Sequence, residues 1–383
     1  MTKSEAPRQK PESQDPGLSF HKMNNDLKYL IALLRFRKFG AKRTAYLRNF
    51  FSSWQDSFQA TLSELIEAGI DPKVAEEFVG QRSLINPEQE LELLPKHDIN
   101  LIPFGDPAYP KHLATIYDPP AALFVRGTLP EPNINYFSVV GTRKITRYGE
   151  QAIYELVPSL AEAGLVIASG LALGVDTAAH KATLMNNGKT TAILPGGIDN
   201  DSIVPKQNLV LAEEIIASGG ALVSEFPPGT NSFKGSFPFR NRIISGLSHG
   251  TLVIEAAERS GSLITAKSAL EQGRDVFAVP GPITSPTSTG PNNLIKMGAT
   301  PTTEPGDILN HYDITDHVSD LPAIEPTDKI EADIFMTLSK DPLHVDLIVK
   351  ATKLSAAKVT GTLTLMEMKG MIRHLGGMHY VKK

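Results

Sequence analysis

The chain has 383 residues, of which 41% are apolar and 21% are charged, and its net charge is −4. This length permits more than one domain, and this balance excludes a uniformly basic nucleic-acid-binding protein. The absence of cysteine excludes disulfides, thiolate zinc sites and cysteine nucleophiles. We expect a cytoplasmic protein, because no run reaches the roughly 18 apolar residues of a membrane span and the first residues lack the apolar core of a signal peptide.

The first segment, residues 1–22, is polar and contains prolines, and we expect it to be a disordered tail. Residues 23–94 read as helical, with apolar positions at helical spacing and a glycine break: Leu27, Leu30, Ile31, Leu34 and Gly40. Further predicted helices are Ala41–Phe51, Leu62–Ala68 and Pro72–Val79. A short helix, a glycine turn and a basic second helix are typical of a helix-hairpin-helix-like DNA module, although a small bundle without a ligand is the plainer interpretation.

Residues 95–312 alternate short apolar runs with stretches of helical period such as Gly149–Glu162 and Gln207–Ala217. This alternation predicts an α/β fold: an extended, Rossmann-like, doubly wound and mostly parallel sheet. Apolar runs without polar alternation indicate strands that are buried on both faces. The predicted strands are Ala122–Val125, Tyr136–Val140, Leu165–Ala168, Thr190–Leu194, Ala221–Ser224, Thr251–Glu255 and Asp275–Val279.

The last region begins with a predicted acidic linker, residues 313–326; seven acidic residues and one lysine lie between Asp313 and Asp333. Three helical stretches and a β-like ending then predict a winged-helix domain over residues 327–383. From Val345 onward the sequence contains seven basic and two acidic residues, which gives this stretch a local net charge of +5. Binding to duplex DNA and docking of a protein are both open for this domain.

Glycine-, serine- and proline-rich loops follow the predicted strands, at the edge where an open parallel sheet binds its ligands. Such loops let backbone amides approach a ligand, and several of them lead into helix N-termini, which favour phosphates. The chain has neither a G-x-x-x-x-G-K-[ST] motif nor a G-x-G-x-x-G motif after a strand. A P-loop and a dinucleotide site are therefore disfavoured, and mononucleotides and polynucleotides remain.

Asn231–Arg242, with the sequence NSFKGSFPFRNR, is the most informative stretch. It interleaves cations with rings, and no acidic residue occurs between Glu225 and Glu255: Lys234, Arg240 and Arg242 alternate with Phe233, Phe237 and Phe239. Cations neutralise the phosphates of a single strand, and unstacked bases lie on aromatic rings. We interpret the Lys-Gly-Ser-Phe-Pro run as a loop, in which a buried ring is less expected.

Arg143 and Lys144 follow the strand Tyr136–Val140, and Arg147 lies one turn later. At the binding edge of the sheet we expect these cations to contact phosphate. With Asn231–Arg242 they supply six cations and no carboxylate, which predicts a local basic patch on an acidic protein.

Candidate catalytic residues are few. Asp176 and His180 are spaced i, i+4, but we expect Asp176 to cap a helix and His180 to pack beside it. Glu225 and Glu255 each end a strand, and no ligand cluster or nucleophile–base spacing joins them, so we assign them structural or hydrogen-bonding roles. No metal site and no cofactor are predicted.

The motifs of the central region resemble those of the DNA-processing protein A (DprA/Smf) family. The resemblance covers about residues 109–299 and runs through Tyr109-Pro110, Asp118-Pro119-Pro120, Val140-Gly141-Thr142-Arg143, Gly174-Val175-Asp176, Leu194-Pro195-Gly196-Gly197, Phe237-Pro238, Arg240–Leu247, Ser260–Ala266 and Ala269–Arg274. The N-terminal helices look like the family's SAM-like domain, and the C-terminal region like its winged-helix domain. Pro195 stands where many members have glycine, and the long polar tail is a second departure.

The resemblance implies a homodimer that binds single-stranded DNA, protects incoming DNA and loads the RecA recombinase during natural transformation. The site residues that it implies are Arg143, Gly170, Gly197, Lys234, Phe237 and Arg240, with Asn241 and Arg242 nearby; Lys144 joins them from its position beside Arg143. This function is not enzymatic. Two alternatives stay open: a nucleotide-processing enzyme of the phosphoribohydrolase type, and a transcription regulator that acts through the winged helix.

Overall fold

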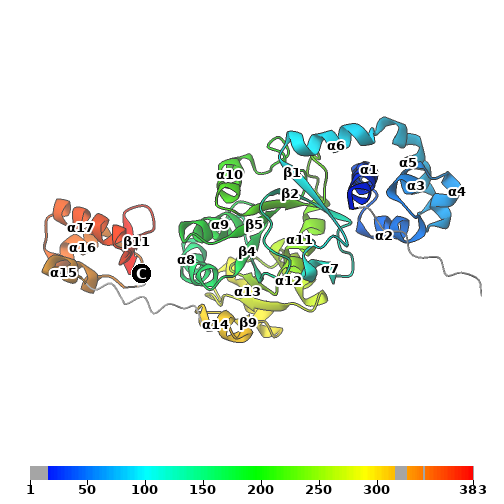
Figure 1. Cartoon of the computed structure of the whole chain (residues 1–383). Helices are drawn as coiled ribbons and strands as arrows, with labels where there is room; N and C mark the ends of the chain where they lie inside the picture. Colours follow the sequence, from blue (N-terminus) through cyan, green and yellow to red (C-terminus); the bar gives the residue numbers. More distant parts are fainter. Residues whose placement is uncertain (1–15, 315–325, 340, 383) are drawn as a thin grey trace, which may run out of the picture. The chain divides into compact units, whose positions relative to one another are not determined.

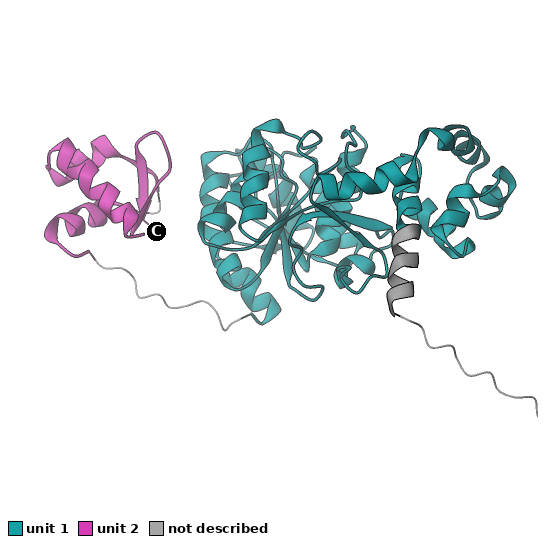
Figure 2. Ribbon diagram, turned by 45° about the horizontal axis from the view of Figure 1, so that its top comes forward, with its two compact units in different colours: residues 1–317 teal, residues 318–383 magenta. Residues whose placement is uncertain are grey.

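The computed structural model describes residues 16–314, 326–339 and 341–382, and the side chains from Asp26 onward. The chain forms two compact units, residues 1–317 and 318–383 (Figure 2). Residues 1–15 of the predicted tail and 315–325 of the predicted acidic linker lie outside the described residues, and the first helix begins at Pro16, within the predicted tail. Among the described residues, none of the helices is both long and apolar enough to cross a bilayer.

The N-terminal part of the first unit is a group of short helices whose starts are set by local capping. Ser53, Thr61, Asp71 and Asn86 each accept a backbone N–H from the first turn of the helix that follows, and Thr61 forms a full capping box with Glu64. The helices are α1 (Pro16–Arg35), α2 (Ala41–Phe50), α3 (Trp54–Gln59), α4 (Leu62–Glu67), α5 (Pro72–Gln81), η1 (Arg82–Leu84) and α6 (Pro87–Lys96). The predicted helices correspond to α1, α2, α4 and α5, whereas α3 and α6 are additional.

Helix α1 belongs to two apolar cores. Leu33 and Phe36 pack among the helices, where the Phe36 and Phe39 ring centres are 5.0 Å apart. Leu30 and Ile31 instead pack against the edge of the central sheet, beside Phe124. The predicted helical domain, 23–94, and the predicted Rossmann-like domain, 95–312, therefore lie in one compact unit.

The centre of this unit is a nine-stranded sheet with helices on both faces (Figure 1). The strand order is β1-β2-β6-β5-β4-β3-β7-β8-β9; the last seven strands are parallel, whereas β2 is antiparallel to both β1 and β6. The strands are β1 (Ile99–Pro103), β2 (Ala122–Gly127), β3 (Tyr136–Val140), β4 (Val166–Ser169), β5 (Thr190–Ile193), β6 (Ala221–Ser224), β7 (Gly250–Val253), β8 (Asp275–Ala278) and β9 (Thr300–Pro301). The doubly wound, mostly parallel fold is confirmed, and all seven predicted strands are present.

Each face of the sheet has its own apolar layer. On one face lie α8 (Arg147–Glu162), α9 (Val175–Met185) and α10 (Leu209–Ala217), and on the other lie α7 (Lys111–Ala114), α11 (Ser236–Leu247) and α12 (Ser262–Glu271). Alternation along β3 sends Phe137 and Val139 to the first face and Tyr136 and Val140 to the second. The remaining elements of the unit are η2 (Lys206–Asn208), η3 (Pro286–Ser288), α13 (Thr289–Lys296), α14 (Gly306–Leu309) and η4 (Asn310–Tyr312).

The second unit is a winged helix, as predicted. It contains α15 (Lys329–Thr337), β10 (Leu343–His344), α16 (Val345–Thr352), α17 (Ala356–Met368), β11 (Ile372–His374) and β12 (His379–Lys382), with the antiparallel strand order β10-β12-β11. Asp328 starts α15 by accepting the N–H groups of Ile330 and Glu331 at 2.7 and 2.8 Å. Ile348, Val359 and Leu363 form the centre of its separate core.

Candidate nucleic-acid interface

A pocket of about 330 Å³ lies beside the carboxyl end of β3. The chain winds from β3 through β4 to β5 in one direction and from β7 to β8 in the other, so β3 stands at the switch point of the sheet. Open α/β sheets bind ligands at this point. The lining of this switch-point pocket includes Gly141, Arg143, Asp176, Phe237, Arg240, Asn241 and Ser260–Ser262.

Arg143 and Phe237 come together here from separate loops. Arg143 is exposed, Phe237 is half-buried, and the guanidinium carbon lies 5.2 Å from the centre of the ring. A cation at this distance is attracted to the face of the ring. Lys144 is exposed beside Arg143, and Arg147 is the exposed first residue of α8. A cation and a ring from separate loops therefore lie side by side at this edge.

The stretch Asn231–Arg242 is not entirely a loop, because α11 begins at Ser236. Pro238 fits the first turn of this helix, where backbone N–H groups have no partner within the helix. Helical spacing divides the side chains between two sides of α11. Phe237, Arg240 and Asn241 line the switch-point pocket, whereas Phe239 and Arg242 do not.

Arg240 is only 4% exposed, and it holds the backbone together rather than offering a free cation. Its Nη1 donates to the carbonyls of Gly170 at 2.6 Å and Ile193 at 2.5 Å. Burial lowers the pKa of Arg240 to about 10, and the nearby Asp176 opposes that shift. Arg240 is therefore a buried cation that is bound to two carbonyls, and it lines the wall of the pocket.

Asp176 does not cap its helix. Its Oδ2 accepts the N–H groups of Gly170 at 3.2 Å and Ala172 at 3.3 Å, so it fixes the loop before α9. Burial raises the pKa of Asp176, and the charge of Arg240 opposes that shift. His180 packs in the interior as expected; its Nδ1 lies 2.7 Å from the Thr190 hydroxyl, and burial lowers its pKa to about 3.

Gly170 and Gly197 both make close internal contacts. The Gly170 amide donates to Asp176, and a Cβ at this position would lie 2.1 Å from Nη1 of Arg240. The Gly197 amide donates to the Thr230 carbonyl at 2.8 Å, and a Cβ there would lie 2.5 Å from Oδ1 of Asp199. The two predicted glycines are thus required by internal contacts, and their amides are already used.

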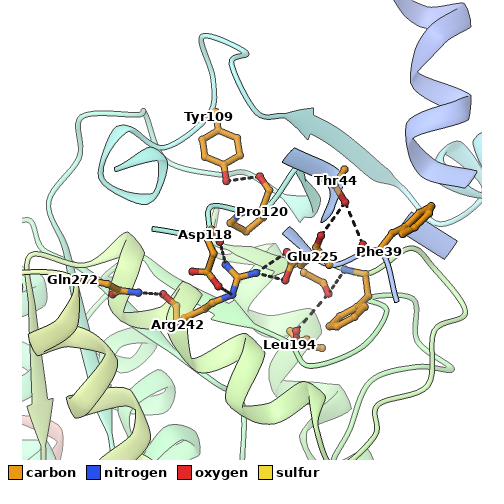
Figure 3. Close-up of polar contacts among 12 residues, drawn as sticks. Phe39, Thr44, Tyr109, Asp118, Pro120, Leu194, Glu225, Arg242 and Gln272 are labelled. Carbon is orange, nitrogen blue, oxygen red and sulfur yellow. Dashed lines mark hydrogen bonds and ion pairs between the residues drawn. The ribbon is translucent and has the colours of Figure 1, made fainter. Parts of the chain in front are cut away.

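Arg242 is the centre of a buried ionic cluster (Figure 3). Its Nη2 donates to both carboxylate oxygens of Glu225 at 2.6 and 2.5 Å, and its Nε lies 3.3 Å from Oδ2 of Asp118. Gln272 donates to the Arg242 carbonyl at 2.9 Å. The predicted group of six cations without a carboxylate is therefore corrected, because Glu225 neutralises Arg242 and Asp176 lies beside Arg240.

The other expected contacts are in part structural. Asn241 lines the pocket and donates from Nδ2 to the carbonyl of Gly261, at the N-terminus of α12, at 3.2 Å. Lys234 is exposed on the loop before α11 and does not line the switch-point pocket. Glu255 accepts hydrogen bonds from Thr146 and Thr287, which confirms its hydrogen-bonding role. In the described part of the chain, no group of three or more histidine or acidic side chains is placed to hold a metal ion.

One basic and aromatic surface was not singled out among the predicted site residues. Arg37 and Lys42 line a second pocket between the α1–α2 turn and the loop that precedes α11. The signal was present in the sequence as Arg35–Arg43, RFRKFGAKR, which interleaves cations and phenylalanines as Asn231–Arg242 does.

Comparison with known proteins places this site in context. Residues 100–313 match the family model of DNA recombination-mediator protein A, and residues 319–378 match the DprA winged helix domain. Protein Smf of Synechocystis is 33% identical over 94% of this chain and 100% of its own length, and Protein Smf of Escherichia coli is 47% identical over 60% and 62%, respectively. The chain thus matches less than two thirds of the E. coli protein.

Two solved structures share the fold. DNA processing protein A (DprA) from Streptococcus pneumoniae is 36% identical and covers 74% of this chain and 97% of its own, with a TM-score of 0.64. DNA processing protein A from Helicobacter pylori, whose structure was described for its unique single-stranded DNA binding mode, is 29% identical. It covers 56% of this chain and 95% of its own, with a TM-score of 0.50.

Proposed function

This chain belongs to the DNA recombination-mediator protein A family, and we propose that it binds single-stranded DNA in the switch-point pocket. The observation that carries the proposal is the exposed Arg143 guanidinium over the half-buried Phe237 ring at the carboxyl end of β3. The cation neutralises a phosphate, and the ring offers a face to an unstacked base. A duplex keeps its bases stacked on one another, so this pairing of groups favours a single strand.

The roles within the pocket follow from exposure. Arg143 and Lys144 contact phosphates, Phe237 stacks a base, and Lys234 extends the positive field along the loop before α11. The buried Arg240 adds charge without leaving its carbonyl partners, and Asn241 positions the N-terminus of α12, where backbone N–H groups favour an anion. Gly170, Gly197 and Arg242 maintain the shape of the site.

We propose further that the chain is a binding protein rather than an enzyme. It would act as a homodimer in the cytoplasm, protect incoming DNA and load RecA during natural transformation. Family membership supports these finer statements. The internal pairing of Glu225 with Arg242 and of Glu255 with Thr146 and Thr287 agrees with a non-catalytic site.

The test is a titration of the full chain with single-stranded and duplex DNA over a range of salt concentrations. Arg143→Ala should weaken single-strand binding about 10-fold or more and reduce the salt slope by about 0.7 for each phosphate that the variant no longer neutralises. The same variant should lose any acceleration of RecA assembly. Equal affinities of wild type and variant would contradict the proposal, and base release from nucleoside monophosphates that is lost in Glu255→Gln would favour the phosphoribohydrolase alternative.

A further inference from the structure

The second pocket, here called the α1–α2 groove, has a volume of about 430 Å³. Its lining comes from both parts of the first unit: Arg37, Lys42 and Tyr46 from the helical part, and Phe226, Phe233 and Phe239 from the segment between β6 and the middle of α11. Figure 3 draws Phe39 of the α1–α2 turn together with Glu225 and Arg242, which also line the groove. The groove is therefore built by folding of the whole unit.

Aromatic rings in this groove are accessible. Phe239 is 54% exposed and Tyr46 is 38% exposed, so a ligand in the groove can reach both rings. Phe233 is half-buried; its ring centre lies 6.3 Å from that of Phe226 and 5.5 Å from the guanidinium carbon of Arg37. The pairing of Arg37 with Phe233 repeats, on a different loop, the pairing of Arg143 with Phe237.

The charges of the groove leave a positive excess. Its carboxylates are occupied, because Glu225 and Asp118 pair with Arg242 and Asp71 accepts two N–H groups at the start of α5. Arg37 and Lys42 are exposed, and among the described side chains neither has a carboxylate partner. Two free cations beside exposed rings suit a ligand that carries both phosphates and flat bases.

Helix α11 connects the groove with the switch-point pocket. Phe237 faces the pocket and Phe239 faces the groove, so the two sites lie on different sides of one helix. Lys234 is exposed on the loop that enters α11, between Phe233 of the groove and Phe237 of the pocket. A flexible strand that passes from the pocket over the start of α11 to the groove would contact Arg143, then Lys234, then Arg37.

We propose that the α1–α2 groove is a second subsite for the same single strand of nucleic acid. Arg37 and Lys42 neutralise phosphates, and Phe239 stacks a base that lies beyond those held in the switch-point pocket. This inference rests on the proposed function, and it extends the binding path from the Rossmann-like part onto the helical part of the unit.

The test measures binding of the full chain to oligothymidylates from about 4 to about 16 nucleotides, the range of a single-strand site. Wild-type affinity should rise with length until both subsites are filled. Phe239→Leu, which keeps apolar bulk but removes the ring, should weaken the longest oligonucleotide about 5-fold or more and leave the shortest unchanged, and Phe239→Trp should restore binding. Lys42→Gln should also lower the salt slope for the longest oligonucleotide by about 0.7.

Matched controls are Phe50→Leu, an exposed ring on α2 outside the groove lining, and Lys96→Gln, an exposed lysine outside both sites. The groove proposal is overturned if the groove variants bind every oligonucleotide with wild-type affinity while Arg143→Ala weakens binding to every oligonucleotide. The proposed function then stands. If the wild type binds no member of the series, both fail. A change in sedimentation without a change in DNA affinity would overturn the proposal by assigning the groove to a second copy of the chain.

Discussion

The switch-point pocket and helix α17 of the second unit both lie in regions where the sequence is rich in basic residues. The two regions differ in the contacts that their cations make. In the pocket, Arg143 is exposed and lies over the ring of Phe237. In the second unit, Lys369 pairs with Glu331 at 2.6 Å, and the Lys382 ammonium lies 4.2 Å from the ring centre of Phe335. Within α17 itself Lys358 is the one basic residue, and it shares the exposed surface with Leu365 and Met368, which are 55% and 80% exposed.

A count of basic residues therefore does not show which cations are free to contact a ligand. A cation contributes when its charge is free and a stacking partner lies beside it, whereas a paired cation mainly supports the fold. The same distinction separates Arg143 from Arg242 within the first unit.

The largest effect is expected at Arg242. Arg242→Ala leaves Glu225 buried without its partner, which should reduce the free energy of unfolding by about 3–5 kcal/mol, whereas Arg143→Ala should leave stability nearly unchanged. Denaturant unfolding of both variants measures the contrast. A stable Arg242→Ala protein that has lost DNA binding would show instead that Arg242 is a binding residue.

A smaller effect is expected for each unit by which the pH is lowered. Burial holds the pKa of His180 near 3 and that of His112 near 4, below the unfolded value of about 6.5. Since protons then bind preferentially to the unfolded chain, stability is complete above about pH 6.5 and falls toward pH 3, by up to about 1.4 kcal/mol per pH unit for each group. His180→Gln should flatten this dependence.

The two units should differ in this respect. The described histidines of the second unit, His344, His374 and His379, are not buried. Hydrogen exchange of the full chain followed by mass spectrometry reads each unit separately. Between about pH 6.5 and pH 4.5 acid should destabilise the first unit selectively. Below that range the second unit should lose stability too, because hydrogen bonds from Lys369 and Thr327 lower the pKa of Glu331 to about 2. Equal sensitivity of both units between about pH 6.5 and pH 4.5 would contradict the assignment to buried histidine.

The smallest effect is expected from the second unit. A chain that ends before Pro326 lacks the winged helix and should bind single-stranded DNA within about 2-fold of the full chain, because α17 offers only one exposed cation. Lys358→Ala should be equally mild. A loss of tenfold or more on truncation would place DNA binding in the winged helix and favour the alternative of a transcription regulator.

The predicted parts of the fold and site have local causes. Continuous apolar runs identify buried parallel strands, and the rule that carboxyl ends of such strands meet at one edge brings Arg143 near Phe237. Strand β1 is not predicted because it lies at the edge of the sheet, and its short run, INLIP, contains Asn100 and Pro103 and is mostly half-buried or exposed. The sequence favours a loop at the start of α11, because Gly235 and Pro238 interrupt most helices, although glycine suits the N-cap and proline the first turn.

The roles of the buried arginines could not be obtained in the same way. Arg242 contacts Asp118, and Arg240 contacts Gly170 and Ile193, through pairings that only the folded chain creates. No local spacing distinguishes these residues from an exposed arginine in a basic stretch. Glycines are equally ambiguous. Gly170 lacks a side chain because Arg240 occupies the space beside it. A glycine that lets a phosphate approach the backbone would look the same in the sequence.

Helix α1 has one further consequence. Because Leu30 and Ile31 lie in the core of the sheet while Leu33 and Phe36 lie in the core of the helices, neither part can rotate without exposing apolar surface on both sides. Arg35 adds to this constraint by donating to Glu90 of α6 and to the Pro228 carbonyl of the β6–α11 loop. The two parts should therefore unfold in a single transition. The distance between the cations of the two parts should also stay constant, which sets a fixed spacing between the phosphates that they contact on a bound polymer.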